Sequence, residues 1–153
     1  MKKLRILLGG NESIKSALES WGFDVTAVTD GKQACSAVYA HLFDLCLLDW
    51  DLPKMTGLEA CGWIRSVNLP AQPYVVLVTH GGKPEEVHAA YLAGANDFIA
   101  GPFNLEDLHF LVSTFAHKIS KTRVAFQNLG FLDPLEQYRR DLSSQPTRIH
   151  SRI

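Results

Sequence analysis

The chain alternates between short apolar runs and longer segments in which apolar residues recur with a helical period. The apolar runs predict strands at Leu4–Leu8, Phe23–Val28, Phe43–Asp49, Tyr74–Thr79 and Asp97–Ala100. The helical periods predict helices near Ser13–Ser20, Lys32–Ala40, Leu58–Val67 and Glu85–Leu92, and a last helix from Leu105 onward. This alternation is typical of βαβ units and predicts an α/β fold with a parallel sheet.

The third predicted strand indicates how the sheet is wound. Leu45–Leu48 is apolar at every position, so this strand should be central and covered by helices on both faces. Right-handed crossovers then give a doubly wound, five-stranded parallel sheet of order 2-1-3-4-5. The carboxyl ends of its strands surround one crevice, where ligands bind. The residues expected at this crevice are Gly9, Gly10, Asp49, Thr79 and Gly101.

The last predicted helix extends beyond the sheet. Its apolar side has coiled-coil-like spacing through Leu108, Val112, Phe115, Ile119, Thr122, Phe126 and Leu129. A helix ending near Ala116 would cover the sheet, so we expect the stripe from Ile119 onward to need another partner. Either a second copy, in a coiled-coil homodimer, or a short helix at Pro134–Leu142 would cover it. We therefore expect a domain at 1–118, a helical extension at 119–142 and a disordered tail at 143–153.

Composition places the chain among ordinary globular proteins. It has 153 residues, of which 46% are hydrophobic and 20% charged, with a formal net charge of -1. These values predict a single folded core and argue against binding to nucleic acid or a membrane surface. The cysteines are odd in number and scattered in apolar or helical segments, which predicts buried thiols in a reducing compartment, and hence a cytoplasmic protein. They are Cys35, Cys46 and Cys61.

Three motifs, in order, resemble the receiver domains of two-component response regulators. Leu48–Gly57 resembles the acceptor loop, Val76–His80 the fourth strand with its terminal hydroxyl residue, and Ala93–Phe103 the fifth strand and its cis-proline loop. The resemblance runs from about Lys3 to Ala116 and implies a flavodoxin-like fold. It places Asp49 at the phosphoacceptor position, and it also implies roles for Thr79 as the hydroxyl residue, Phe98 as the switch aromatic and Pro102 as the cis-proline. Because Phe98 has no hydroxyl to satisfy, core packing is the simpler expectation for it.

The charges that phosphorylation of this aspartate requires are missing. Phosphoryl transfer to a carboxylate needs compensating positive charge. The resemblance implies a Mg²⁺ ion, held in part by two acidic residues after the first strand, and a lysine before the proline. The acidic pair maps onto Gly9 and Gly10, or onto Gly10 and Asn11 after a one-residue slip, and the lysine maps onto Gly101. We therefore expect no cofactor.

Other residues offer partial substitutes. A displaced Mg²⁺ site could use Asp49, Asp51 and Glu12, although Mg²⁺ tolerates little distortion from octahedral geometry. Lys54 or Lys83 could swing over a bound anion, but solvated loop positions are the simpler expectation. The six histidines show no metal-ligand spacing, so we expect them to face solvent or to pack.

The resulting prediction is a degenerate receiver, or pseudo-receiver. It would be a non-enzymatic protein–protein interaction module of bacterial signal transduction. The implied partner is a histidine kinase or an output protein, bound on the fourth helix, fifth strand and last helix. The alternative is a working phosphoacceptor, phosphorylated at Asp49 by a histidine kinase through an atypical metal site. Leu129–Leu135 also resembles the junction that precedes a diguanylate cyclase domain, so the extension could be a remnant of a larger regulator.

Overall fold

A computed structural model describes residues 3–128, with side chains through residue 125. This part of the chain forms one five-stranded sheet of order β2-β1-β3-β4-β5, in which every neighbouring pair is parallel. The strands are β1 (Arg5–Gly9), β2 (Asp24–Val28), β3 (Leu45–Asp49), β4 (Tyr74–Thr79) and β5 (Asp97–Ala100). The predicted fold class and strand order are confirmed.

The helices follow the predicted order. They are α1 (Lys15–Ser20), α2 (Gly31–Ala40), α3 (Gly57–Ser66), α4 (Pro84–Leu92) and α5 (Leu105–Asn128). The first predicted helix begins as a 3-10 turn, η1 (Glu12–Ile14), before α1. The third strand begins two residues later than predicted. Phe43 is buried but precedes the ladder, so its apolar character reflects core packing rather than strand pairing.

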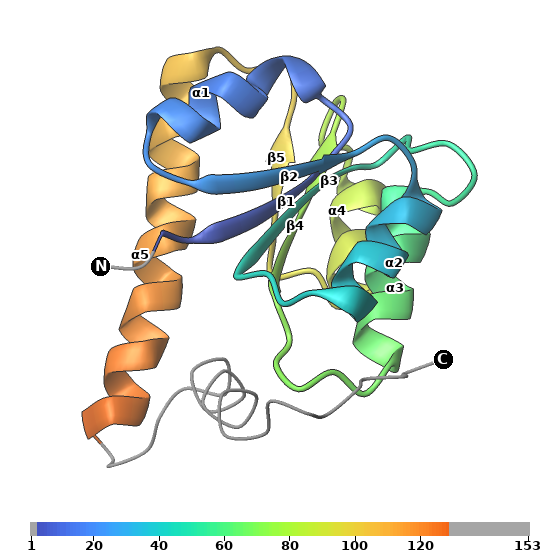
Figure 1. The fold of residues 1–153 in the computed structure, drawn as a ribbon. Helices are drawn as coiled ribbons and strands as arrows, with labels where there is room; N and C mark the ends of the chain where they lie inside the picture. Colours follow the sequence, from blue (N-terminus) through green and yellow to red (C-terminus); the bar gives the residue numbers. More distant parts are fainter. Residues whose placement is uncertain (1–2, 129–153) are drawn as a thin grey trace.

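The helices form two layers around the sheet (Figure 1). On one face α2 and α3 pack through small and branched side chains such as Ala34, Val38 and Ile64. On the other face α1 and α5 pack through Leu18, Val112 and related residues. Residues 45–48 of β3 are buried between these layers, as predicted for a central strand.

A close backbone contact sets the position of the loop after β3. At Gly31, the first residue of α2, a β-carbon would lie 1.8 Å from the Met55 carbonyl oxygen. The Gly31 N–H also donates to the Pro53 carbonyl at 3.2 Å. The same loop ends in a capping box, in which Thr56 and Glu59 satisfy each other's backbone N–H groups at the start of α3. The loop between Asp49 and α3 is therefore held at both ends.

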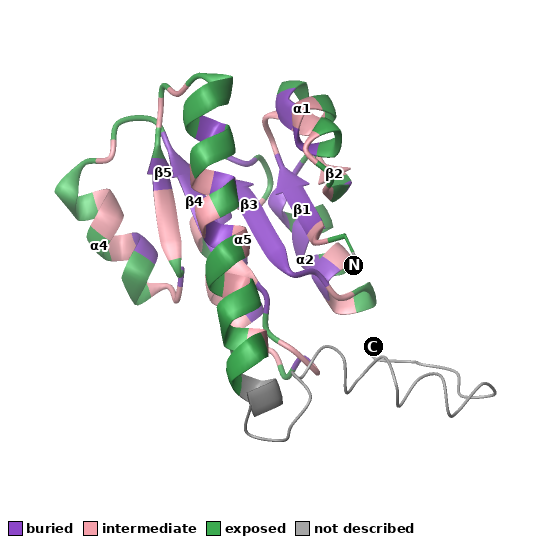
Figure 2. Cartoon of the chain, turned by 90° about the vertical axis from the view of Figure 1, so that its left-hand side faces the viewer, coloured by how far each residue is buried: buried purple, intermediate pink, exposed green. Residues whose placement is uncertain are grey.

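Helix α5 is attached to the sheet over a longer stretch than predicted. Ile119 packs against the same core cluster as Val112 and Phe115, so the expectation that its own domain would not cover Ile119 is wrong. One turn further, the Arg123 guanidinium pairs with the buried Asp44 carboxylate at the start of β3. In Figure 2 the strands behind α5 are buried, and much of the opposite side of the helix is exposed.

Several predictions fall outside the described residues. These are the Phe126 side chain, Leu129, the helix at Pro134–Leu142 and the tail at 143–153, and the homodimer and the fold-back hairpin both depend on them. Within residues 3–128, no helix is both long enough and apolar enough to cross a membrane.

Candidate functional site

The carboxylate of Asp49 lies at the carboxyl end of the central strand, β3. Its side chain is 17% exposed. The Asp51 backbone N–H donates to Asp49 Oδ1 at 3.0 Å, which makes an Asx-type turn immediately after β3. Below it, Gly57 packs so closely that a β-carbon there would lie 2.2 Å from the Asp49 carbonyl oxygen. Asp49 is thus presented on a tightly packed turn.

The loop after β1 provides an amide donor to this carboxylate. Gly10 and Asn11 have φ values of 76° and 50°. These two left-handed residues turn the chain so that Asn11 Nδ2 donates to Asp49 Oδ2 at 3.3 Å. Sequence reasoning considered Asn11 only as a place where a metal-binding carboxylate was missing. The structure shows it to be a hydrogen-bond partner of the acceptor-position aspartate.

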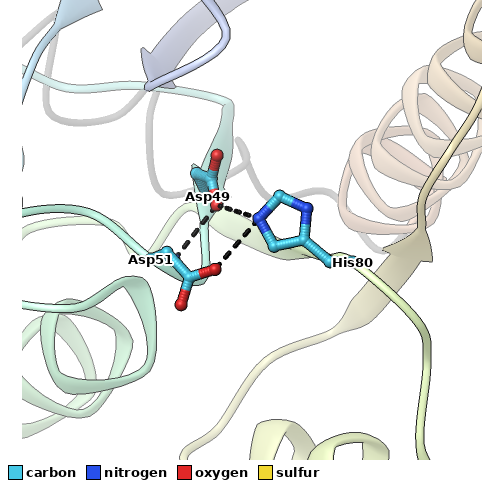
Figure 3. Close-up of side chains that lie close together, drawn as sticks. All are labelled: Asp49, Asp51 and His80. Carbon is cyan, nitrogen blue, oxygen red and sulfur yellow. Dashed lines mark hydrogen bonds and ion pairs between the residues drawn. The ribbon is translucent and has the colours of Figure 1, made fainter.

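The third side chain at this carboxylate is His80, directly after β4. Its Nε2 lies 2.9 Å from Asp51 Oδ2 and 3.7 Å from Asp49 Oδ1. Figure 3 shows the ring directed from the β4 end toward both carboxylates. Within the described residues, these three side chains form a group in which one potential metal-ligand atom from each lies within 4.8 Å of the other two. Glu12 of the displaced Mg²⁺ hypothesis is exposed and is not in this group.

His80 was missed because histidine spacing along the chain carries no signal here. Its neighbours in the site come from a different strand, so no sequence interval links them. The available signal was its place directly after Thr79, at the carboxyl end of a buried strand, where the fold brings side chains to the crevice.

The remaining predicted positions surround this group without adding charge to it. The Thr79 side chain is buried, and its hydroxyl oxygen accepts from the Gly82 N–H at 3.2 Å. Gly101 donates its N–H to the Thr79 carbonyl at 2.7 Å, and the Gly101–Pro102 peptide is cis. Phe98 is half-buried and makes an edge contact with Tyr91 of α4, at a centroid distance of 6.1 Å.

The nearby lysine of the acceptor loop is engaged elsewhere. Lys54 Nζ lies 3.6 Å from Asp30 Oδ2, and Asp30 caps α2 by accepting from the Gln33 N–H at 2.8 Å. That hydrogen bond is the main cause that lowers the pKa of Asp30, with Lys54 adding to it and burial opposing it. Lys54 therefore lies beside the α2 cap, not over Asp49.

The donor set does not fit the magnesium site that the receiver resemblance implies. A β-carbon at Gly10, in its left-handed conformation, would lie 2.9 Å from the Asp49 β-carbon, so a carboxylate at this position needs a different loop. Asn11 donates an N–H to the very carboxylate that would ligate the ion. Mg²⁺ prefers several oxygen ligands in near-ideal octahedral geometry, and here an imidazole joins the two carboxylates instead.

Relatives of the chain are bacterial signalling proteins. The transcriptional regulatory protein CrdR of Helicobacter pylori is 31% identical over 105 residues, which are 69% of this chain and 49% of CrdR. RprY of Bacteroides fragilis is 26% identical over 123 residues, covering 77% of this chain and 51% of RprY. The autoinducer 2 sensor kinase/phosphatase LuxQ of Vibrio cholerae is 35% identical over 122 residues, 76% of this chain and 14% of LuxQ. The chain thus spans about half the length of CrdR and RprY.

Structural similarity and a family model lead to the same assignment. The receiver domain of the sensor histidine kinase PA1611 from Pseudomonas aeruginosa, solved with magnesium coordinated in its active-site cleft, is 27% identical with a TM-score of 0.63. The match covers 74% of this chain and 98% of that domain. A sequence model of the response regulator receiver domain matches residues 11–113. This chain therefore belongs to the response regulator receiver-domain family.

Proposed function

We propose that this chain is an atypical receiver domain that acts by protein–protein interaction and does not depend on Mg²⁺-assisted phosphorylation of Asp49. The observation that carries the proposal is the engagement of the Asp49 carboxylate. One oxygen accepts from Asn11, and the other accepts from the Asp51 N–H and lies near His80. Groups from the chain itself thus engage both oxygens of this carboxylate, without the lysine or the all-oxygen Mg²⁺ site of the family.

Charge explains why this arrangement opposes phosphorylation. A phosphoryl group adds roughly −1.5 to −2 charges at neutral pH. The exposed carboxylate of Asp51 lies within the same group of donor atoms, and the nearby Lys54 is paired with Asp30. The added charge would meet repulsion from Asp51 with neither of the family's compensating groups present.

The partner is proposed to be a kinase or an output protein of a cytoplasmic signalling pathway. The family occurs both in regulators such as CrdR and in the sensor kinase LuxQ. Figure 2 shows α4 and α5 on either side of β5. Leu92 on α4 is 75% exposed and Phe110 on α5 is 72% exposed, so both offer apolar area to a partner. Self-association through α5 remains the second form of this interaction.

Phosphorylation at Asp49 is the competing function, favoured by the retention of Asp49 and Asp51 at the end of the central strand. The test is incubation with acetyl phosphate and Mg²⁺, followed by rapid intact-mass analysis, with Asp49→Asn as the control. We expect neither wild type nor the control to gain mass during the incubation. Stoichiometric gain of one phosphoryl group by wild type, absent from Asp49→Asn, would establish the competing function.

The cleft itself is proposed to remain a cation-binding site with a changed donor set. The receiver domain of PA1611 holds magnesium in its active-site cleft. In this chain, the ends of β3 and β4 bring two carboxylates and an imidazole together at the crevice. The chemistry of these donors differs from that of an all-oxygen site, and this difference selects another class of ion.

A further inference from the structure

The geometry of Asp49, Asp51 and His80 points to a site for one divalent transition-metal ion of the zinc class. We propose that these three side chains bind such an ion through Asp49 Oδ1, Asp51 Oδ2 and His80 Nε2. The inference rests on the proposed loss of Mg²⁺ dependence and names the ion that the altered cleft would take instead. The sequence-based alternative placed Asp49 and Asp51 in a Mg²⁺ site with Glu12; here His80 takes the place of Glu12.

The distances between donor atoms suit a small ion. Zinc binds imidazole nitrogen and carboxylate oxygen at about 2.0–2.1 Å, so two ligands of a tetrahedral site lie about 3.3 Å apart. His80 Nε2 lies 2.9 Å from Asp51 Oδ2 and 3.7 Å from Asp49 Oδ1, on either side of that value. A shift of a few tenths of an ångström in an exposed ring would bring both distances to it.

The three ligands differ in how firmly the surrounding structure holds them. Asp49 is largely buried, and the Asp51 N–H and Asn11 orient its carboxylate. The side chains of His80 and Asp51 are 70% and 65% exposed, so an ion reaches them directly from solvent. One ligand is thus fixed in advance and two are free to close on the ion.

The imidazole decides which ion is favoured. Imidazole ligands suit zinc, copper, nickel and related ions, whereas Mg²⁺ prefers oxygen ligands and gives up its water reluctantly. Two carboxylates supply the charge that offsets a divalent ion. Three protein ligands leave a fourth position open for water or for a group from a partner protein.

Binding would reinforce the link between two loops that His80 and Asp51 already bring into contact. Asp49 ends β3, Asp51 lies in the turn after it, and His80 begins the connection from β4 to α4. An ion held by all three would fix these two loops relative to each other. The metal-loaded and metal-free forms would then present different loop positions to a partner.

The test is calorimetric titration of the untagged full chain with Zn²⁺, in parallel with the visible absorption spectrum of bound Co²⁺. We expect one saturable site per chain and a cobalt spectrum that indicates tetrahedral nitrogen and oxygen ligation, without a thiolate charge-transfer band. Loss of a group that only supports a metal ligand typically weakens affinity 10- to 100-fold, so His80→Ala and Asp51→Asn should each weaken Zn²⁺ binding at least about tenfold. The matched control is His88→Ala, which removes an exposed imidazole from α4 and should leave binding unchanged.

The outcomes separate this inference from the proposed function. Lack of stoichiometric Zn²⁺ binding, or binding that His80→Ala leaves unchanged, would overturn the metal site and leave the interaction module standing. Saturable Mg²⁺ binding that displaces Zn²⁺ and is lost in Asp49→Ala, together with phosphorylation of Asp49, would overturn the proposed function. Zinc binding lost in both ligand variants and kept in His88→Ala would establish the site.

Discussion

Replacing Arg123 should destabilise the protein more than a substitution at an α5 surface position normally does. Its guanidinium pairs with Asp44, whose side chain is only 2% exposed, while the Arg123 side chain is 28% exposed. Asp44 also accepts from the Arg5 backbone N–H at 2.7 Å. The ion pair joins the far end of α5 to the start of the central strand, across 79 positions of sequence.

The magnitude follows from the burial of the two partners. Removing one partner of a fully buried ion pair costs about 3–5 kcal/mol, and an exposed pair contributes about 0–1 kcal/mol. Arg123 is partly exposed and Asp44 keeps its backbone donor, so we expect Arg123→Met to lower the free energy of unfolding by about 2–3 kcal/mol. Methionine retains an apolar stem of similar reach, so this value reflects mainly the unpaired carboxylate.

The measurement is urea unfolding followed by tryptophan fluorescence and circular dichroism. Asp44→Asn removes the buried charge, so the double variant should be less destabilised than the sum of the two single variants, with a coupling energy of about 1–2 kcal/mol. Lys121→Met, an exposed cation on the same helix, is the matched control and should stay within about 0.5 kcal/mol of wild type. If Arg123→Met also stays within that range, or if the double variant is additive, the reasoning is refuted.

Two further predictions concern the glycines and the thiols. Gly31→Ala should lower the free energy of unfolding by about 3 kcal/mol or more, because the new β-carbon would lie 1.8 Å from the Met55 carbonyl oxygen. Gly62→Ala, in the interior of α3, should instead raise the free energy of unfolding by about 0.5–1 kcal/mol, because a β-carbon there would meet no atom within 4 Å. Equal thermal stability of the two variants would contradict this. Burial raises the pKa of Cys35 to about 11 and also raises the pKa values of Cys46 and Cys61, so a thiol reagent at pH 8 should react with the native protein far more slowly than with the unfolded chain. The unfolded thiols ionise near pH 8.5, so the stabilisation from the buried neutral thiols is complete below about pH 8.5 and is lost as the pH rises toward 11. If the thiols of the native protein react as fast as those of the unfolded chain, the predicted protection by burial is wrong.

Local sequence patterns were sufficient for the elements and their order. The apolar run at residues 45–48 predicted a central strand because only a position covered on both faces excludes polar residues. Helix starts are set locally as well: Asp30 accepts from the Gln33 N–H three residues later, at the start of α2. The position of Asp49 at the crevice followed from the same rule, since parallel strands bring their carboxyl ends to one edge of the sheet.

The contacts within the site were not readable in the same way. Asn11 and His80 reach Asp49 from the ends of β1 and β4, so their distances depend on strand register and on the turn each loop makes. Asp51 contacts Asp49 through a local turn, two residues further along the chain. The left-handed conformation of Gly10 and Asn11 is what directs the Asn11 amide toward the carboxylate. Sequence alone identified missing charges at Gly9, Gly10 and Gly101. It did not show which side chains lie against Asp49.

The last helix shows the same division most clearly. Its apolar period determined which side faces inward, because side chains three and four residues apart share one face of a helix. It did not determine how far the domain extends beneath that side, because this depends on where the sheet and its connecting segments end. The structure places core residues under Ile119 and the buried Asp44 beside Arg123, so the helix is held by its own domain beyond Ala116. Sequence periodicity determined the orientation of this helix, and only tertiary packing decided its contacts, because burial requires a partner surface brought in from elsewhere in the chain.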